Sequence, residues 1–253
     1  MAAMVLAACL GMISPAWAIV PLAIFLLLCA VAPFLPGVSF FLPIISRGTD
    51  KETGVTLSFD DGPHPQSTPV ILELLTRHNC KATFFIVAEQ AAKYPELVHE
   101  ILARGHTIGN HSLRHDSLLM LRSPRTIALD IRRAQEILQR FGVRPLLFRP
   151  PVAITNPRLG RILEAEGLVA VNYSCRAFDR GNRNIVNLAT RILDRVRPGD
   201  IIMLHDLPPH RPDVQEEWHR ELDQLLDTLH GRYRVVPLAR LIRRPVMSRP
   251  IQR

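Results

Sequence analysis

The stretch Thr56–Pro63, with the sequence TLSFDDGP, ends an apolar run in two adjacent carboxylates and a turn signal. The run at residues 55–59 is β-branched and apolar, which is typical of a buried strand, and the Gly-Pro pair would end it. Asp60 and Asp61 then lie at the carboxyl end of the strand, where catalytic groups gather in barrels and open α/β folds. Because neighbouring carboxylates repel each other, the pair indicates a bound cation. Taken alone, a helix N-cap followed by a turn aspartate explains it equally well.

Strands and helices are expected to alternate through the rest of the chain. Alternation of this kind indicates parallel βαβ units. Further strands are expected at residues 82–87, 106–109, 146–148, 168–173, 200–204 and 233–236. Helices are expected at residues 66–78, 95–103, 124–141, 156–166, 185–196, 214–229 and 238–242. Several strands end in polar side chains, and in a barrel such strand ends form one site.

Two histidines follow the third expected strand. His111 and His115 are four residues apart, so both imidazoles would face the same way if the segment formed one helical turn. Two imidazoles and the carboxylate of Asp61 are ligands typical of a catalytic zinc that keeps an open position. The histidine pair alone is a weak signal, because exposed helices carry such pairs by chance.

Four motifs in order resemble the polysaccharide deacetylase (NodB-homology) family, a carbohydrate esterase type. They are residues 56–63, HSLRH at 111–115, FRPP at 148–151 and MLHD at 203–206. The resemblance covers about residues 54–238 and implies an α/β fold, a distorted seven-stranded (β/α) barrel. It also implies a hydrolase acting on carbon-nitrogen bonds of linear, non-peptide amides.

The resemblance implies a role for each motif. One divalent metal ion, most often zinc, would be held by Asp61, His111 and His115. Asp60 matches the general base, and Arg149 matches the arginine that holds this base. His205 matches the general acid, and Asp179 is expected to accept a hydrogen bond from it. The backbone N–H of Val152, which follows Pro151, could bind the oxyanion.

Three short segments depart from the commoner family pattern. Val152-Ala153 replaces Tyr-Gly, and residues 173–176 (YSCR) replace Trp-Ser-x-Asp. Asp179-Arg180 replaces Asp-Trp, so the carboxylate is kept and the aromatic wall is lost. Arg176 and Arg180 indicate a more polar, anionic or lipid-linked substrate, or they are ordinary surface arginines.

The first 46 residues contain no charged side chain. A membrane span needs about 20 apolar residues, so we expect an anchor of one span or a two-span hairpin at residues 1–46. A linker (47–54), the catalytic domain (55–242) and a basic tail (243–253) would follow. A cleaved signal peptide, a lipoprotein box and a buried arm are the alternatives. A single span with the N-terminus inside would place the domain on the extracytoplasmic side, and this is the topology we expect. A two-span hairpin would instead place the domain on the same side as the N-terminus.

Charge and cysteine content exclude some classes of function. The formal net charge is +8, almost all from arginine, which suits anionic lipids or acidic glycans. No nucleic acid partner is expected, because no nucleic-acid-binding motif is present. The four cysteines form neither a disulfide framework nor a zinc knuckle pattern.

Three functions follow from these observations. The first is a metal-dependent hydrolase that removes N-acetyl groups from amino sugars of a cell-envelope polysaccharide. The second is a deacetylase or deformylase of a lipid-linked sugar, with the membrane contacted through residues 1–46. The third, from another class, is a non-catalytic glycan-binding relative.

Overall fold

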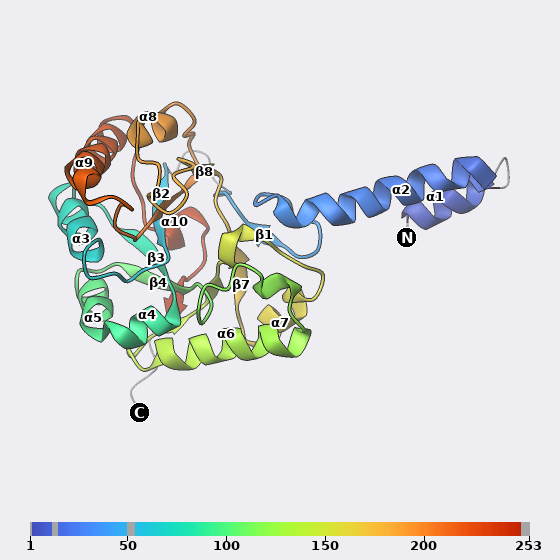
Figure 1. Cartoon of the computed structure of the whole chain (residues 1–253), viewed down its shortest axis with the longest axis horizontal. Coiled ribbons are helices and arrows are strands. Elements are labelled where there is room, and N and C mark those ends of the chain that lie inside the picture. Colours follow the sequence, from blue (N-terminus) through green and yellow to red (C-terminus); the bar gives the residue numbers. More distant parts are fainter. Residues whose placement is uncertain (1, 12–14, 50–53, 249–253) are drawn as a thin grey trace.

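An eight-stranded parallel sheet forms the centre of the domain and curls inside a shell of helices (Figure 1). The computed structural model describes residues 2–11, 15–49 and 54–248. The order of the strands is β1-β7-β6-β4-β3-β2-β9-β8. Their bounds are β1 (Ile44–Ile45), β2 (Thr56–Asp60), β3 (Ala82–Ile86), β4 (Thr107–Asn110), β6 (Leu147–Phe148), β7 (Val169–Val171), β8 (Cys175–Arg176) and β9 (Ile201–His205).

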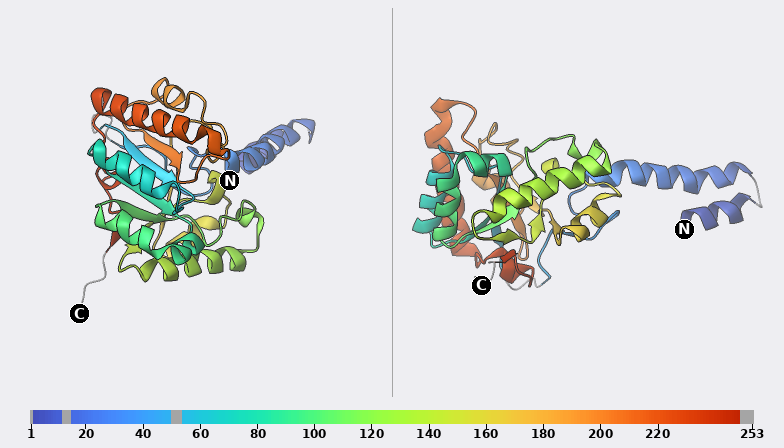
Figure 2. Two further views of the ribbon diagram at one scale, coloured as in Figure 1. Left: turned by 60° about the vertical axis from the view of Figure 1, so that its left-hand side comes forward. Right: turned by 90° about the horizontal axis from the view of Figure 1, so that it is seen from below.

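The helices surround the sheet (Figures 1 and 2). Their bounds are α3 (Thr68–Arg77), α4 (Ala88–Lys93), α5 (Pro95–Ala103), α6 (Pro124–Gln139), α7 (Leu159–Ala165), α8 (Leu188–Leu193), α9 (Gln215–Arg232) and α10 (Leu238–Leu241). A second, antiparallel pair joins β5 (Arg144–Pro145) to β10 (Met247–Ser248). The predicted alternation of parallel strands and helices is confirmed.

The sheet is an open, curled half-barrel of eight strands, which corrects the expected distorted barrel of seven strands. Its described edges are β1 and β8, two strands that the sequence did not predict. The strand expected at residues 233–236 is reduced to a bridge between Val55 and Val235. Since β3 and β9 already occupy both sides of β2, this segment can pair only with the residue that precedes β2.

Strand register brings the predicted motifs to one edge of the sheet. Asp60, the last residue of β2, is paired with His205, the last residue of β9. On the other side, Asn110 at the end of β4 is paired with Phe148 at the end of β6. His111 and Arg149 directly follow these two residues. All four motifs therefore reach the same carboxyl edge.

Packing in the hydrophobic core fixes the positions of the strands that carry the site. The rings of Phe59 on β2 and Phe84 on β3 stack with centroids 5.2 Å apart. Trp218 on α9 is fully buried in the same cluster. Close packing of this kind lets short strands position the side chains that follow them.

The apolar N-terminal segment forms an arm of two helices that extends away from the domain (Figures 1 and 2). They are α1 (Ala2–Gly11) and α2 (Pro15–Val31), and they contact each other. None of the helices among the described residues is long and apolar enough to cross a membrane. The predicted membrane-anchored localisation is therefore wrong on this finding.

Residues that were assigned to the apolar segment also complete the sheet. Ile44 and Ile45 pair in parallel with Ala170 and Val171, so β1 covers the edge of β7. Leu42 is buried in a cluster with residues of α6, α7 and β7. Of the remaining expected segments, residues 50–53 of the linker and 249–253 of the tail lie outside the described residues.

Leu42→Ala is expected to lower the free energy of unfolding by about 2 kcal/mol. This is the low end of the range for a leucine truncated in a core, because Leu42 is 6% exposed whereas Leu159 in the same cluster is fully buried. Val38→Ala is the control, since Val38 is 40% exposed and surface changes usually stay within about 0.5 kcal/mol. Urea unfolding of the two variants measures the difference; equal midpoints would mean that this segment does not support the domain.

Candidate active site

A cavity of about 960 Å³ opens at the carboxyl edge of the sheet. This volume lies at the upper end of the range for ligand sites, roughly 300–1,000 Å³. Most of the predicted site residues line it. They are Asp60, Asp61, His111, His115, Arg149, Val152, Asp179 and His205. Pro151 is buried and is not among the lining residues.

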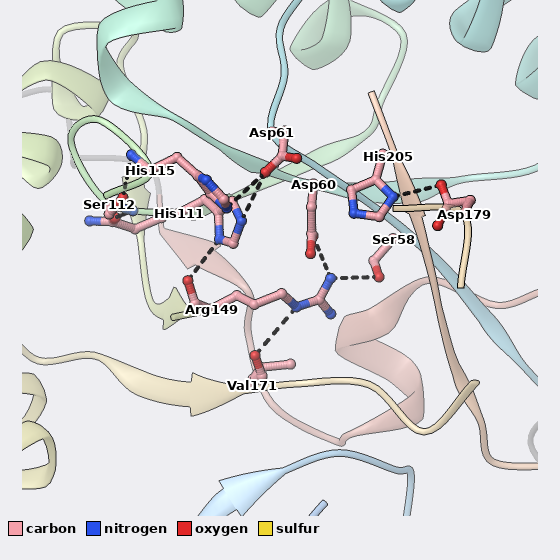
Figure 3. Close-up of polar contacts among 11 residues, drawn as sticks. Ser58, Asp60, Asp61, His111, Ser112, His115, Arg149, Val171, Asp179 and His205 are labelled. Atoms are coloured by element: carbon pink, nitrogen blue, oxygen red, sulfur yellow. Dashed lines mark hydrogen bonds and ion pairs between the residues drawn. The ribbon is translucent and has the colours of Figure 1, made fainter. Parts of the chain in front are cut away.

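Asp61, His111 and His115 form the candidate metal centre (Figure 3). One ligand atom from each lies within 4.8 Å of the others. Nε2 of His111 is 3.3 Å from Oδ1 of Asp61, and Nε2 of His115 is 3.2 Å from the same oxygen. Three nitrogen and oxygen donors at this spacing fit a divalent ion with an open coordination position.

The segment that carries the two histidines is a loop and not the helical turn that the sequence suggested. Ser112 and His115 adopt left-handed φ angles of 72° and 56°. The N–H of His115 donates to Oγ of Ser112, and the N–H of Leu113 donates to Asp130 on α6. The imidazoles still converge, with ring centroids 4.9 Å apart.

Two further observations fit a cation at this centre. Nδ1 of His111 lies 2.8 Å from the backbone oxygen of Arg149, so Nδ1 carries the proton and Nε2 keeps its lone pair for a metal. Oδ1 of Asp61 is buried and accepts no hydrogen bond from the described residues. Burial would raise the pKa of Asp61, but the neighbouring imidazoles, His111 first, hold it well below its usual range. An ionised carboxylate oxygen that accepts no hydrogen bond in a buried site is the kind of atom that a cation stabilises.

Arg149 holds the predicted base, Asp60. Its guanidinium donates to Oδ1 of Asp60 at 2.6 Å and to Oγ of Ser58 at 2.9 Å. Other N–H groups of Arg149 donate to the backbone oxygens of Val171 and Asn172. Because the pair is almost wholly buried, the arginine keeps a compensated negative charge inside the cavity and fixes its orientation.

The predicted contact between His205 and Asp179 is present. Nδ1 of His205 lies 2.7 Å from Oδ2 of Asp179, and the opposite edge of the ring faces Asp60 (Figure 3). Burial alone would lower the pKa of His205. The hydrogen bond and charge of Asp179, helped by the two aspartates of β2 and its turn, outweigh burial and raise the pKa to about 9. The imidazole is therefore protonated at neutral pH.

Val152 lies in a short 3-10 turn, η4 (Pro151–Ala153), beside the cavity. Its φ is 51°, in the left-handed region, which is unfavourable for a β-branched residue. Asp61, Phe178 and Arg180 also line the cavity with left-handed φ angles. Such conformations cost on the order of 1–3 kcal/mol each and concentrate at functional sites.

Sequence reasoning missed several residues that support the site. Asn182 donates from its side chain to the backbone oxygens of His205 and Leu207, which fixes the strand end. Asp206, which follows β9, accepts hydrogen bonds from Ser67 and Thr68 and so ties the end of this strand to the N-terminus of α3. The MLHD motif contains Asp206, so its position after the predicted acid was the available signal. Nothing in the local pattern distinguished Asn182.

Comparison with known proteins gives one consistent result. A family model described as polysaccharide deacetylase matches residues 47–171. Chitooligosaccharide deacetylase from Azorhizobium caulinodans is 35% identical over 175 residues, 68% of this chain and 82% of the relative. A peptidoglycan-N-acetylglucosamine deacetylase from Bacillus cereus is 31% identical over 159 residues, 62% of this chain and 74% of the relative.

Solved structures agree with the sequence comparisons. The crystal structure of the Bc1960 peptidoglycan N-acetylglucosamine deacetylase matches with a TM-score of 0.72 and 30% identity, over 80% of this chain and 94% of that one. A family 4 carbohydrate esterase from Streptomyces lividans, in complex with acetate, matches with a TM-score of 0.63 and 26% identity, over 72% and 97%. The chain belongs to the polysaccharide deacetylase (NodB-homology) family of hydrolases, as the order of its motifs predicted.

Proposed function

We propose that this enzyme removes the N-acetyl group from N-acetylglucosamine residues of a cell-envelope glycan, with one divalent metal ion, zinc by preference. The observation that supports the proposal most is the convergence of three ligand atoms, a buried base and a protonated imidazole on one cavity. The named relatives act on chitooligosaccharide and on peptidoglycan N-acetylglucosamine.

Asp61, His111 and His115 would hold the cation. When bound, a divalent ion lowers the pKa of a coordinated water and polarises the acyl carbonyl. We infer that the site prefers zinc from its donor atoms, which are two imidazole nitrogens and one carboxylate oxygen. The remaining steps depend on side chains of the protein.

Asp60 accepts a proton from the attacking water. Arg149, which also donates to Ser58, fixes the carboxylate through one oxygen, which leaves the other oxygen for the proton. As the water oxygen bonds to the acyl carbon, the backbone N–H of Val152 donates to the carbonyl oxygen, where negative charge develops. A backbone donor serves here even though valine replaces the commoner tyrosine.

His205 gives its Nε2 proton to the departing nitrogen. Nδ1 keeps its own proton for Asp179, so the ring stays oriented after the transfer. Cleavage of the carbon-nitrogen bond then yields a free amino sugar and acetic acid, which ionises to acetate in solution. Transfer of the proton from Asp60 to His205 through solvent restores the starting protonation of both residues. Base and acid each contribute on the order of a hundredfold or more.

Acetate release from a panel of glycans tests the proposal. N-acetylated chitooligosaccharides and peptidoglycan fragments should release acetate, and a chelator should stop the release until a divalent ion is returned. Comparison of zinc with other divalent ions in the restored enzyme identifies the preferred metal. Glycan binding with no acetate release under any metal would favour the non-catalytic alternative.

A lipid-linked sugar remains a second candidate substrate, with acetyl or formyl as the acyl group. The observation that favours it is the arginine-rich wall of the cavity, which suits an anionic linkage to a lipid. Inclusion of polyprenyl-phosphate sugars in the same panel separates this substrate from a polymeric glycan.

A further inference from the structure

Four arginines line the cavity in addition to Arg149, which holds the base. They are Arg176, Arg180, Arg183 and Arg191. All four belong to the segment from β8 to the first turns of α8, at the top of the domain in Figure 1. One wall of the cavity is therefore lined by guanidinium groups.

The charges of this wall are not compensated by the protein. The three carboxylates that line the cavity already have partners: Asp60 pairs with Arg149, Asp61 contacts the two histidines, and Asp179 pairs with His205. Among the described residues, no carboxylate lies within 4.0 Å of any of the four arginines. Since an arginine does not lose its proton in a protein, the wall attracts an anion.

Arg176 is held in place by aromatic rings. Its guanidinium donates to the hydroxyl of Tyr173 at 2.8 Å and lies 4.2 Å from the ring centroid of Phe178. Arg195 contacts the same phenyl ring, 5.2 Å from its centroid. One of the five N–H groups of Arg176 is engaged by Tyr173, and an orientation fixed by stacking lowers the entropy that binding would cost.

Arg191 holds the loop that carries the other arginines. It donates to the backbone oxygens of Asn184 and Asn187. Arg180, in this loop, has a left-handed φ of 54°. The side chains of Arg180 and Arg183 are exposed at the mouth of the cavity. The wall thus has a fixed inner cation, Arg176, and an exposed outer pair.

We propose that these arginines form a subsite for an oxyanion substituent on the substrate, a phosphate or carboxylate borne by the sugar next to the one that loses its acetyl group. The proposal rests on the proposed deacetylase function for the neighbouring reaction. Guanidinium groups bind both anions through paired N–H donors. A neutral glycan would leave all four without a negative counter-charge from the described residues.

The test compares three disaccharides that differ in charge. They are diacetylchitobiose, its 1-phosphate, and N-acetylglucosaminyl-N-acetylmuramic acid, which bears a carboxylate. At low salt, at least one of the two anionic substrates should have a kcat/KM at least tenfold higher than that of the neutral one. The difference should come from a lower KM. The advantage should shrink as salt screens the charges. The two anionic arms show whether phosphate or carboxylate is preferred.

Arg176→Gln combined with Arg180→Gln should lower the ratio of anionic to neutral kcat/KM at least tenfold. The matched control is Arg133→Gln with Arg140→Gln, which removes the same charge from exposed positions on and just after α6 and should keep the ratio of the unaltered enzyme. If the first variant fails to fold, the exposed Arg183→Gln replaces it. An unchanged ratio, or equal losses on all substrates, would overturn the proposal.

Direct binding separates this proposal from the proposed function. In an Asp60→Asn enzyme, calorimetry should show the preferred anionic disaccharide binding at least tenfold more tightly than diacetylchitobiose, and the double arginine variant should remove the difference. Such binding without acetate release by the unaltered enzyme would leave the subsite standing and refute the deacetylase. Acetate release at equal rates from neutral and anionic substrates would support the deacetylase and refute the anion subsite.

Discussion

Asp61→Asn is expected to lower the affinity for a divalent cation by more than a hundredfold and to remove most of the deacetylase activity at the same metal concentration. Loss of a residue that only hydrogen-bonds to a metal ligand costs roughly 10–100-fold in metal affinity. Asp61 supplies a ligand atom itself, so its loss should cost more. Asparagine has nearly the same shape and tolerates the left-handed φ of 75° found here. The variant therefore removes the charge and keeps the backbone.

Metal content and activity should fall together. Both are measured after dialysis against a buffered zinc concentration, and part of the activity should return as zinc is raised. His111→Ala should behave in the same way, whereas His99→Ala, at an exposed position on α5, should retain metal and activity. An Asp61→Asn enzyme with full activity at unchanged metal content would show that the cation is held elsewhere.

Strand ends and the family resemblance together predicted which residues meet at the candidate site, because Asp60 and His205 end strands and His111 and Arg149 directly follow them. The apolar run that ends at Asp60 marks the carboxyl end of β2, and the parallel register with β9 places His205 beside it. The contact between His205 and Asp179 was predicted from the resemblance to the family and is present at 2.7 Å. In a parallel sheet, the strand assignment and the order of motifs together fix which side chains meet.

Features that depend on distant contacts were not predicted. β1 and β8 have two residues each, too few for any periodicity to be detected, and they form only because a neighbouring edge is available. The turn of His115 is set by Ser112 and by Asp130 from α6, so the helical spacing of the two histidines was misleading. The composition of residues 1–46 indicated a membrane anchor, but apolar composition does not determine how long each helix becomes.

The four arginines of the cavity wall were only partly predictable from the sequence. Arg176 and Arg180 stand out in the sequence because they replace residues common in the family, but the sequence does not distinguish them from surface arginines. Arg183 and Arg191 belong to no motif, so nothing in the sequence marks them. Only the fold of the loop between β8 and α8 places all four on one cavity.

The second large effect concerns the acid. His205→Ala is expected to lower kcat by about a hundredfold or more, the scale for a lost general acid, with metal content unchanged. His210→Ala, at an exposed position five residues later in the chain, is the control and should alter neither. Steady-state rates with metal analysis on the same samples check both statements. A fall in metal content with His205→Ala would assign this residue to the metal centre instead.

The pH profile tests the pairing with Asp179. The acid is active while protonated, and the pKa of His205 is raised to about 9, so activity is present below that pH and lost as pH rises through it. A bound cation would repel the imidazolium and move this alkaline limb to a lower pH. In Asp179→Asn the charge that opposes burial is gone, so the pKa of His205 falls and the limb shifts further toward neutral pH. Since kcat/KM reports ionisations of the free enzyme, its profile is the measurement, and a limb that stays in place would show that another group donates the proton.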